Sequence, residues 1–196
     1  MSEKEKNWFS RHKILTGIIV LIAVIAIAGA ASGGSDTNST SNSTSSESNK
    51  DGQKTYKFDD RADKQDKDLE IIAGESATVD GVKLTVNKIE KKTSASEFEQ
   101  AKSGSTYVIA DVTLENTNKD TKPYNVFDFR IQTAGGQVLD GAFATVPTPL
   151  SSGDLVAGGK VSGQIVFETP IEEGKNQYII WKPNAFNSDR AIVQVK

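Results

Sequence analysis

The densest group of carboxylates lies in the segment YKFDDRADKQDKD, residues 56–68. Clustered carboxylate oxygens suit Ca²⁺, and the best match to an EF-hand loop begins at Asp66 and continues with Asp68 and Glu70. The match fails at Ile71, where that loop requires a glycine. Lysine and arginine alternate with the acids, so we interpret the segment as solvated, paired in local ion pairs or disordered, and we predict no metal. The acids are Asp59, Asp60, Asp63, Asp66 and Asp68.

Other residue types that do chemistry are scarce. The chain has 196 residues, no cysteine and one histidine, His12. The sequence beyond His12 therefore offers no serine–histidine or cysteine–histidine pair, and the chain has no thiolate metal site, disulfide or cysteine-linked lipid. We predict no cofactor and no enzymatic activity. The alternative is an envelope hydrolase that uses carboxylates brought together by the fold.

One stretch, WKPNAFNSDR (residues 181–190), mixes aromatic and polar side chains. Aromatic rings and arginine recur at binding hot spots, so we expect contacts to a sugar or a peptide here. The candidate contacts are Trp181, Asn184, Phe186, Arg190 and, after a proline, Tyr124. For Trp181 itself we favour the alternative interpretation, a place in the core, because it shares a strand face with Ile179. A formal net charge of −3 argues against a nucleic-acid partner.

The elements that position these residues begin with an uncharged apolar run at residues 14–31. As a helix it would be about 27 Å long, enough to cross a bilayer core. Basic residues precede it, within the flank of residues 1–13, and the next lysine is Lys50. The positive-inside rule then predicts a single-pass membrane protein with a cytoplasmic N-terminus and an extracellular C-terminal domain. The alternative is a cleaved signal sequence and a secreted protein, since Ala28 and Ala30 fit a cleavage site.

Residues 32–54 form a linker rich in Ser, Thr and Asn, and its stretch from Ser32 to Gly52 has no aliphatic or aromatic side chain. Such a segment buries nothing that would offset the entropy of ordering it, so it predicts a flexible tether. Its r.m.s. reach is roughly 25 Å. We expect the domain that follows, residues 55–196, to lie close to the outer surface of the membrane.

Residues 55–196 read as short strands in which apolar and polar residues alternate. Four stretches each place their apolar side chains on one face of a strand: VKLTVNKI, TYVIADVTLEN, FDFRIQT and VSGQIVFE. In FDFRIQT, the side chains of Phe127, Phe129 and Ile131 share a face. Asp80-Gly81 and other glycine-rich turns separate the strands. The pattern predicts an antiparallel β-sandwich. SASEFEQAK, residues 94–102, is the exception and predicts a short helix from a weak capping box.

Three motifs occur in a fixed order: GESATV from Gly74, VTLENT ending after Asn116, and GGKVSGQIVF from Gly158. In this order the chain resembles the telokin-like, immunoprotective-extracellular family of bacterial surface domains over residues 70–182. The resemblance implies an immunoglobulin-like sandwich behind a signal or anchor, and it carries over no catalytic or binding residue. We therefore expect an anchored binding or accessory module of the envelope whose partner is a cell-wall polymer or an envelope protein.

The apolar run predicts an anchor that stays on the mature protein. It is longer than the usual signal h-region of about 7–15 residues, and its best cleavage site lies at its far end. The protein should sediment with membranes and resist extraction by alkaline carbonate. N-terminal sequencing decides the matter, because a mature chain that begins at Ala31 or Ser32 would show a secreted protein instead.

Overall fold

The computed structural model describes residues 45–48, 54–61 and 63–196. The chain divides into two compact units, Met1–Asn42 and Ser43–Lys196, and only the second contains described residues. The predicted cytoplasmic flank (1–13), membrane segment (14–31) and most of the linker lie outside the described residues. Within the described part of the chain, no helix is long and apolar enough to cross a membrane.

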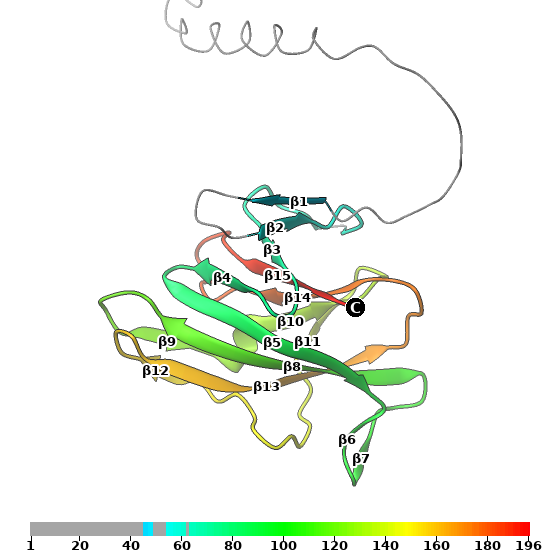
Figure 1. The fold of residues 1–196 in the computed structure, drawn as a ribbon. Helices are drawn as coiled ribbons and strands as arrows, with labels where there is room; N and C mark the ends of the chain where they lie inside the picture. Colours follow the sequence, from blue (N-terminus) through cyan, green and yellow to red (C-terminus); the bar gives the residue numbers. More distant parts are fainter. Residues whose placement is uncertain (1–44, 49–53, 62) are drawn as a thin grey trace, which may run out of the picture. The chain divides into compact units, whose positions relative to one another are not determined.

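Two β-sheets packed face to face make up the described unit, so the predicted all-β sandwich is confirmed (Figure 1). The five-stranded sheet has the order β11-β10-β14-β15-β3, and the four-stranded sheet has the order β13-β8-β5-β4. Three two-stranded pairs, β1-β2, β9-β12 and β6-β7, complete it. The strands are β1 (Ser45–Ser48), β2 (Lys54–Lys57), β3 (Leu69–Ile71), β4 (Ser76–Val79), β5 (Val82–Lys92), β6 (Ser94–Ser96), β7 (Glu99–Gln100), β8 (Ser105–Asn116), β9 (Lys122–Tyr124), β10 (Phe129–Gln132), β11 (Val138–Asp140), β12 (Gly153–Leu155), β13 (Lys160–Pro170), β14 (Gln177–Trp181) and β15 (Ala191–Val195).

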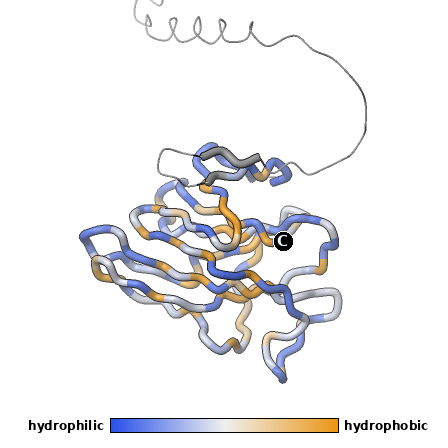
Figure 2. The backbone as a smooth tube through the Cα atoms, viewed as in Figure 1, coloured by the Kyte–Doolittle hydropathy of each residue, from blue (hydrophilic) through white to orange (hydrophobic). Residues whose placement is uncertain are grey.

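The alternating pattern places the core as predicted. Inward residues of β5, β8 and β13 are buried against inward residues of β10, β14 and β15. Figure 2 shows the result as hydrophobic segments along the strands and mostly hydrophilic turns. Asp80 and Gly81 both have positive φ, 50° and 75°, which is the backbone of a two-residue hairpin turn between β4 and β5.

Trp181 lies in this core and is 1% exposed. Its ring stacks on Phe129 with centroids 5.9 Å apart. β14 delivers Trp181 and Ile179 to the inner face, as the alternative interpretation of Trp181 expected. The ring is therefore a packing element of the sandwich, beyond the reach of a ligand at the surface.

Three details of the prediction are wrong. β15 pairs with β3 in parallel, so the five-stranded sheet is mixed. Parallel pairing is possible here because no tight turn joins these two strands. Val126–Asp128 is a 3₁₀ turn that Asn125 caps through a capping box, so the strand begins at Phe129 and Phe127 turns outward. The predicted helix at residues 94–102 is the hairpin β6–β7, closed by Ala101 N–H donating to Thr93 O at 2.8 Å. So short a helix would be marginal without a packed face.

Each sheet is also apolar on part of its outer face. On the five-stranded sheet, Tyr178, Ile180 and Ile192 are buried beneath Phe58. On the four-stranded sheet, Tyr107, Ile109 and Val166 are buried beneath Val146 and several alanines. Segments outside the main strands therefore cover both outer faces, and those segments form the sites described below.

Replacing Trp181 with alanine should lower the free energy of unfolding by about 3–5 kcal/mol, because it removes a fully buried ring and leaves a cavity. Urea unfolding of residues 43–196 measures the effect. Phe186→Ala is the matched control, since Phe186 is fully exposed and its loss should change stability little. A loss below about 1 kcal/mol for Trp181→Ala would contradict the core assignment.

Candidate functional site

The acidic segment forms a strap, residues 56–61 and 63–70, that lies on the outer face of the five-stranded sheet. Phe58 is buried there against Tyr178, with ring centroids 5.3 Å apart, and Tyr56 stacks on Phe58 at 6.1 Å. The Asp60 carboxylate accepts hydrogen bonds from the hydroxyl of Tyr178 and from Asn176 Nδ2. The strap thus covers the apolar side chains of this face and supplies a hydrogen-bond acceptor to Tyr178 and Asn176.

Two arginines hold the strap. Arg190 Nη1 lies 2.8 Å from Asp63 Oδ2, and Arg190 Nε lies 2.7 Å from Asp68 Oδ1. Arg61 also bonds Asp68, whose side chain is 2% exposed. The acids are therefore ion-paired, but not in the predicted local pairs three or four residues apart, because Arg61 lies seven residues from Asp68 and Arg190 lies 122 residues from it. Solvation is wrong for Asp68. No group of acids that could hold a metal ion occurs among the residues that the structure describes.

Burial and pairing shift the pKa values of these acids in opposite directions. Burial acts to raise the pKa of Asp68, but hydrogen bonds from Arg190, Gln65 N–H and Arg61 outweigh it and lower the pKa below its usual value. Burial raises the pKa of Glu70. The hydrogen bond from Phe58 N–H and the positive charge of Arg61 offset this rise only in part. Glu70 Oε2 accepts from Phe58 N at 2.6 Å, while Oε1 lies 3.6 Å from Arg61 Nη2.

The residues proposed from WKPNAFNSDR do not meet in one site. Trp181 is in the core and Arg190 is bound to the strap. Asn184 and Phe186 lie in the loop after β14, where Asn184 Oδ1 accepts from Phe186 N at 2.9 Å. Tyr124 lies on β9, with its hydroxyl 3.3 Å from Ser151 Oγ. A ligand role for Asn184, Phe186 and Tyr124 stays a prediction.

A pocket of about 180 Å³ lies instead at the opposite edge of the sandwich from β3 and β4. After β11, residues 141–150 run beside β13, the edge strand of the four-stranded sheet. Ala142 N–H donates to Val166 O at 2.7 Å, and Gln164 N–H donates to Thr148 O at 2.6 Å. Gly163 permits this approach, because a Cβ there would lie 2.6 Å from Leu150 Cα.

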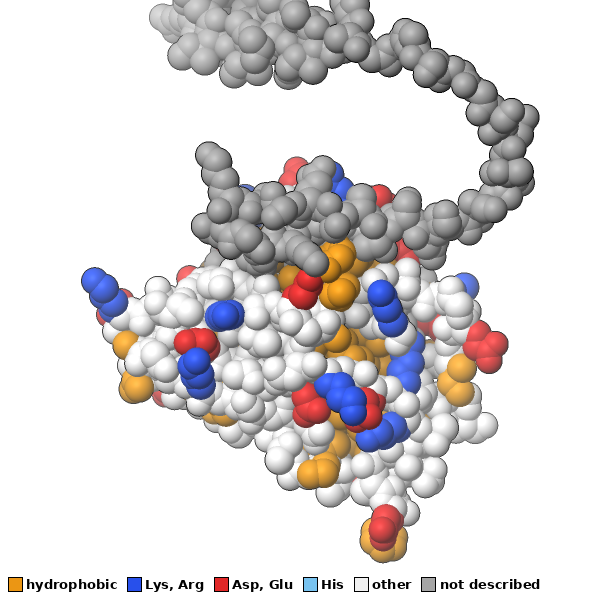
Figure 3. Space-filling view, in the orientation of Figure 1, with side chains coloured by type: hydrophobic (Ala, Val, Ile, Leu, Met, Phe, Trp, Pro, Cys, Tyr) orange, Lys and Arg blue, Asp and Glu red, His pale blue; other side chains and the backbone are white. Residues whose placement is uncertain are grey.

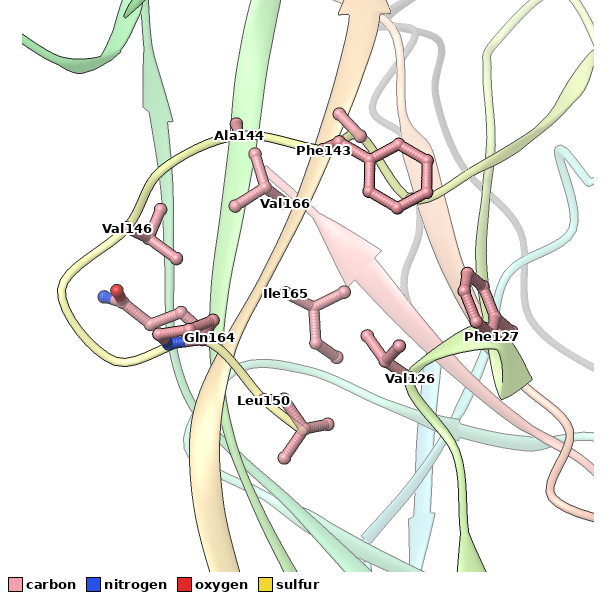
Figure 4. A pocket seen from close by; sticks show the side chains of 12 residues that line it. Val126, Phe127, Phe143, Ala144, Val146, Leu150, Gln164, Ile165 and Val166 are labelled. Carbon is pink, nitrogen blue, oxygen red and sulfur yellow. The ribbon is translucent and has the colours of Figure 1, made fainter. Parts of the chain in front are cut away.

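Figure 4 shows the side chains that line the pocket, with Ile165 at the centre, Phe127 and Phe143 on one side and Gln164 on the other. No lining residue is charged. Phe127 is 64% exposed and Phe143 is 93% exposed, so two aromatic rings stand in water beside an apolar hollow. The lining residues are Val126, Phe127, Gly141, Ala142, Phe143, Ala144, Val146, Pro149, Leu150, Gln164, Ile165 and Val166.

Sequence reasoning missed this pocket, although a signal was present. GAFATVPTPL, residues 141–150, is apolar without the alternation of a strand and lies between two turns. An apolar loop of this kind must cover something or bind something. The arrangement can accept one apolar group, and its lining offers neither an acid–base pair nor a nucleophile with a neighbouring base.

Asp68→Asn should destabilise the fold by about 3–5 kcal/mol at pH 7, because it leaves two buried arginines without their shared carboxylate. The folded-state pKa of Asp68 is lowered, so its contribution is present above the unfolded value near 3.8 and is lost as the pH falls through the folded value. The difference between wild type and variant should therefore shrink at pH 3. Urea unfolding at both pH values tests this, with the exposed Asp59→Asn as control. Equal stability of Asp68→Asn and wild type at pH 7 would contradict the role of the strap.

Several proteins are similar to this chain. The "Uncharacterized lipoprotein YjhA" of Bacillus subtilis (strain 168) is 25% identical over 146 residues, which cover 66% of this chain and 68% of that protein. A putative lipoprotein (ycdA) from Bacillus subtilis has a TM-score of 0.52 and 14% identity over 62% of this chain and 38% of its own. The secreted protein MPT63 of Mycobacterium tuberculosis has a TM-score of 0.51 and 14% identity over 67% of this chain and 100% of its own. At these identities the two structures support the fold alone.

Residues 71–192 match the family described as "Domain of unknown function (DUF4352)". The match begins at Ile71, immediately after the strap, and includes the whole pocket, the four-stranded sheet and all of the five-stranded sheet except most of β3 and β15. The chain therefore belongs to the DUF4352 family.

Proposed function

We propose that this chain is a membrane-anchored module of the cell envelope whose immunoglobulin-like, telokin-like sandwich binds a partner through the pocket at its β13 edge. Residues 14–31 are the single membrane span, with the N-terminus in the cytoplasm, and residues 32–54 are the tether. The relative that is 25% identical is named as a lipoprotein, which supports an exported domain. This chain has no cysteine to carry a lipid, so the apolar run takes the place of the lipid anchor.

The observation that carries the binding role is the pocket itself. Its volume of about 180 Å³ is close to that of an engineered apolar cavity of roughly 150 Å³ that binds benzene, and below the roughly 300–1,000 Å³ of typical small-molecule sites. It therefore fits one large apolar side chain better than a whole metabolite. The exposed rings of Phe127 and Phe143 extend the contact beyond the hollow.

An envelope protein suits this chemistry better than a wall polymer. A glycan or a phosphate polymer needs several hydrogen-bonding or basic groups, whereas Gln164 is the one polar side chain among the lining residues. Burial of a large apolar side chain is worth about 1.5–3 kcal/mol, and a Kd of 1 mM corresponds to about 4 kcal/mol. Affinity for an isolated side chain should then be millimolar or weaker.

A catalytic role is not part of the proposal. Asp63 and Asp68 are engaged with arginines, and Asp60 with Tyr178. The pKa shift of Glu70 follows from its burial beneath the strap, away from the pocket. These acids serve the structure, so the carboxylate hydrolase has no observation in its favour.

Titration of residues 43–196 with N-acetyl-phenylalaninamide tests the pocket, since this unit is compact and has its own core. Saturable NMR shifts should appear at the amides of Ala144, Gln164 and Val166. Ala144→Leu fills the pocket and should weaken binding at least tenfold, because a larger side chain occupies the volume that the probe needs.

Ala157→Leu makes the same change on the exposed turn between β12 and β13 and should leave the titration unaltered. Shifts that never saturate, or that persist in Ala144→Leu, would overturn the binding role of the pocket.

A further inference from the structure

The hairpin β6–β7 presents Phe98 at its tip, 96% exposed. In Figure 3 an apolar side chain protrudes with an acidic one at the tip of this hairpin. The hairpin itself is docked, because Ala95 and Ala101 pack against the cluster of Tyr107 and Val146 on the outer face of the four-stranded sheet. The exposed ring is thus held on a fixed support.

The same hairpin is bonded to the loop that forms the pocket. Thr145 N–H donates to Glu99 Oε2 at 2.6 Å. Thr145 lies between Ala144 and Val146, both of which line the pocket, and Glu99 follows Phe98 directly. A protruding aromatic ring and an uncharged hollow of suitable size therefore lie beside each other on one surface.

We propose that the partner in the pocket is a second copy of this chain, with Phe98 of each copy inserted into the pocket of the other. This inference rests on the proposed binding role of the pocket. A two-fold axis between the copies would bring the Phe98 ring of each copy to the pocket of the other at the same time. This is the isologous arrangement of most homodimers. The occupant has the chemistry that the pocket requires: one large, uncharged aromatic side chain.

The contact area agrees with a weak, reversible dimer. Phe98, Phe127 and Phe143 of two copies would together bury about 900–1,500 Å², at roughly 150–250 Å² per aromatic side chain. Specific interfaces bury about 1,200–2,000 Å² in total, so this pair lies at or below the lower end of that range, where weak and transient contacts occur. Copies confined to one membrane meet at a high effective concentration, and such an interface is then sufficient.

The position at which the chain enters the sandwich leaves this surface open. The strap leads into β3, an edge strand of the five-stranded sheet, whereas the pocket lies at the β13 edge (Figure 1). Strand addition at this part of β13 is a poor alternative, because residues 142–150 already bond its edge at Gln164 and Val166. Insertion of a side chain is the mode that the surface permits.

The absence of cysteine allows a direct test in the full-length, membrane-bound protein. One tagged copy carries Phe98→Cys and a second, differently tagged copy carries Ala144→Cys. After mild oxidation of membranes that contain both, a non-reducing gel should show a heterodimer. Its yield should exceed at least tenfold that of the matched pair Phe186→Cys with Ala144→Cys. Phe186 is equally exposed but lies near the β4–β5 turn, at the other end of the 11-residue strand β5.

Resistance of each variant to trypsin verifies that it is folded. Equal yields from the two pairs would overturn the inference, as would crosslinks from Ala144→Cys to a different protein only. If N-acetyl-phenylalaninamide still binds the pocket in that case, the second copy alone is refuted and the binding role stands. If neither the specific crosslink nor binding of N-acetyl-phenylalaninamide to the pocket is observed, the proposed function is refuted as well.

Discussion

Each sheet of the sandwich is apolar on its inner face and on part of its outer face, and the need to cover these outer apolar parts shapes the rest of the molecule. The inner faces cover each other around Trp181 and Phe129. The outer residues Tyr178, Ile180 and Ile192 require the strap, and the outer residues Tyr107, Ile109 and Val166 require the loop 141–150 and the hairpin β6–β7. Burial of each such side chain is worth about 1.5–3 kcal/mol, which is enough to order short segments that have little structure of their own.

The two coverings differ in how completely they close. The strap places Phe58 against its face and is held there by the ion pairs of Arg61 and Arg190, so the apolar side chains beneath it are covered. The loop at β13 leaves a hollow and two exposed rings, at Phe127 and Phe143. A partner can bury the apolar surface that an incomplete covering leaves exposed. For that reason the proposed function rests on the loop 141–150, while the acidic strap has a structural role.

Alternation of apolar and polar residues was sufficient to predict the sandwich, because side chains in a strand point to opposite faces. It was insufficient for Ile180 and Ile192, whose outward apolar side chains break the pattern and signalled a covered outer face. The cap at Asn125 is a local signal, since its partners are Phe127 and Asp128, but the alternation of Phe127 and Phe129 concealed it. The pairing of Gln164 with Thr148 depends on tertiary context that local patterns do not carry. The same holds for Arg190, whose acidic partners are 122 and 127 residues away. The apolar stretch 141–150 signalled a covered or binding surface, but the place of the pocket could not be predicted, since it exists only where these residues return to β13.

The strap also determines how the sandwich bears mechanical load. Tension applied through the residues before Tyr56 must pass along the strap, where the Arg190 ion pairs and the Phe58–Tyr178 contact oppose it, before it reaches β3. From β3 the load is shared sideways through β15, β14 and β10 to the 3₁₀ turn that carries Val126 and Phe127. A pull on the N-terminal side and a grip at the pocket would therefore load the five-stranded sheet from β3 to β10, and the hydrogen bonds between these strands would resist the tension.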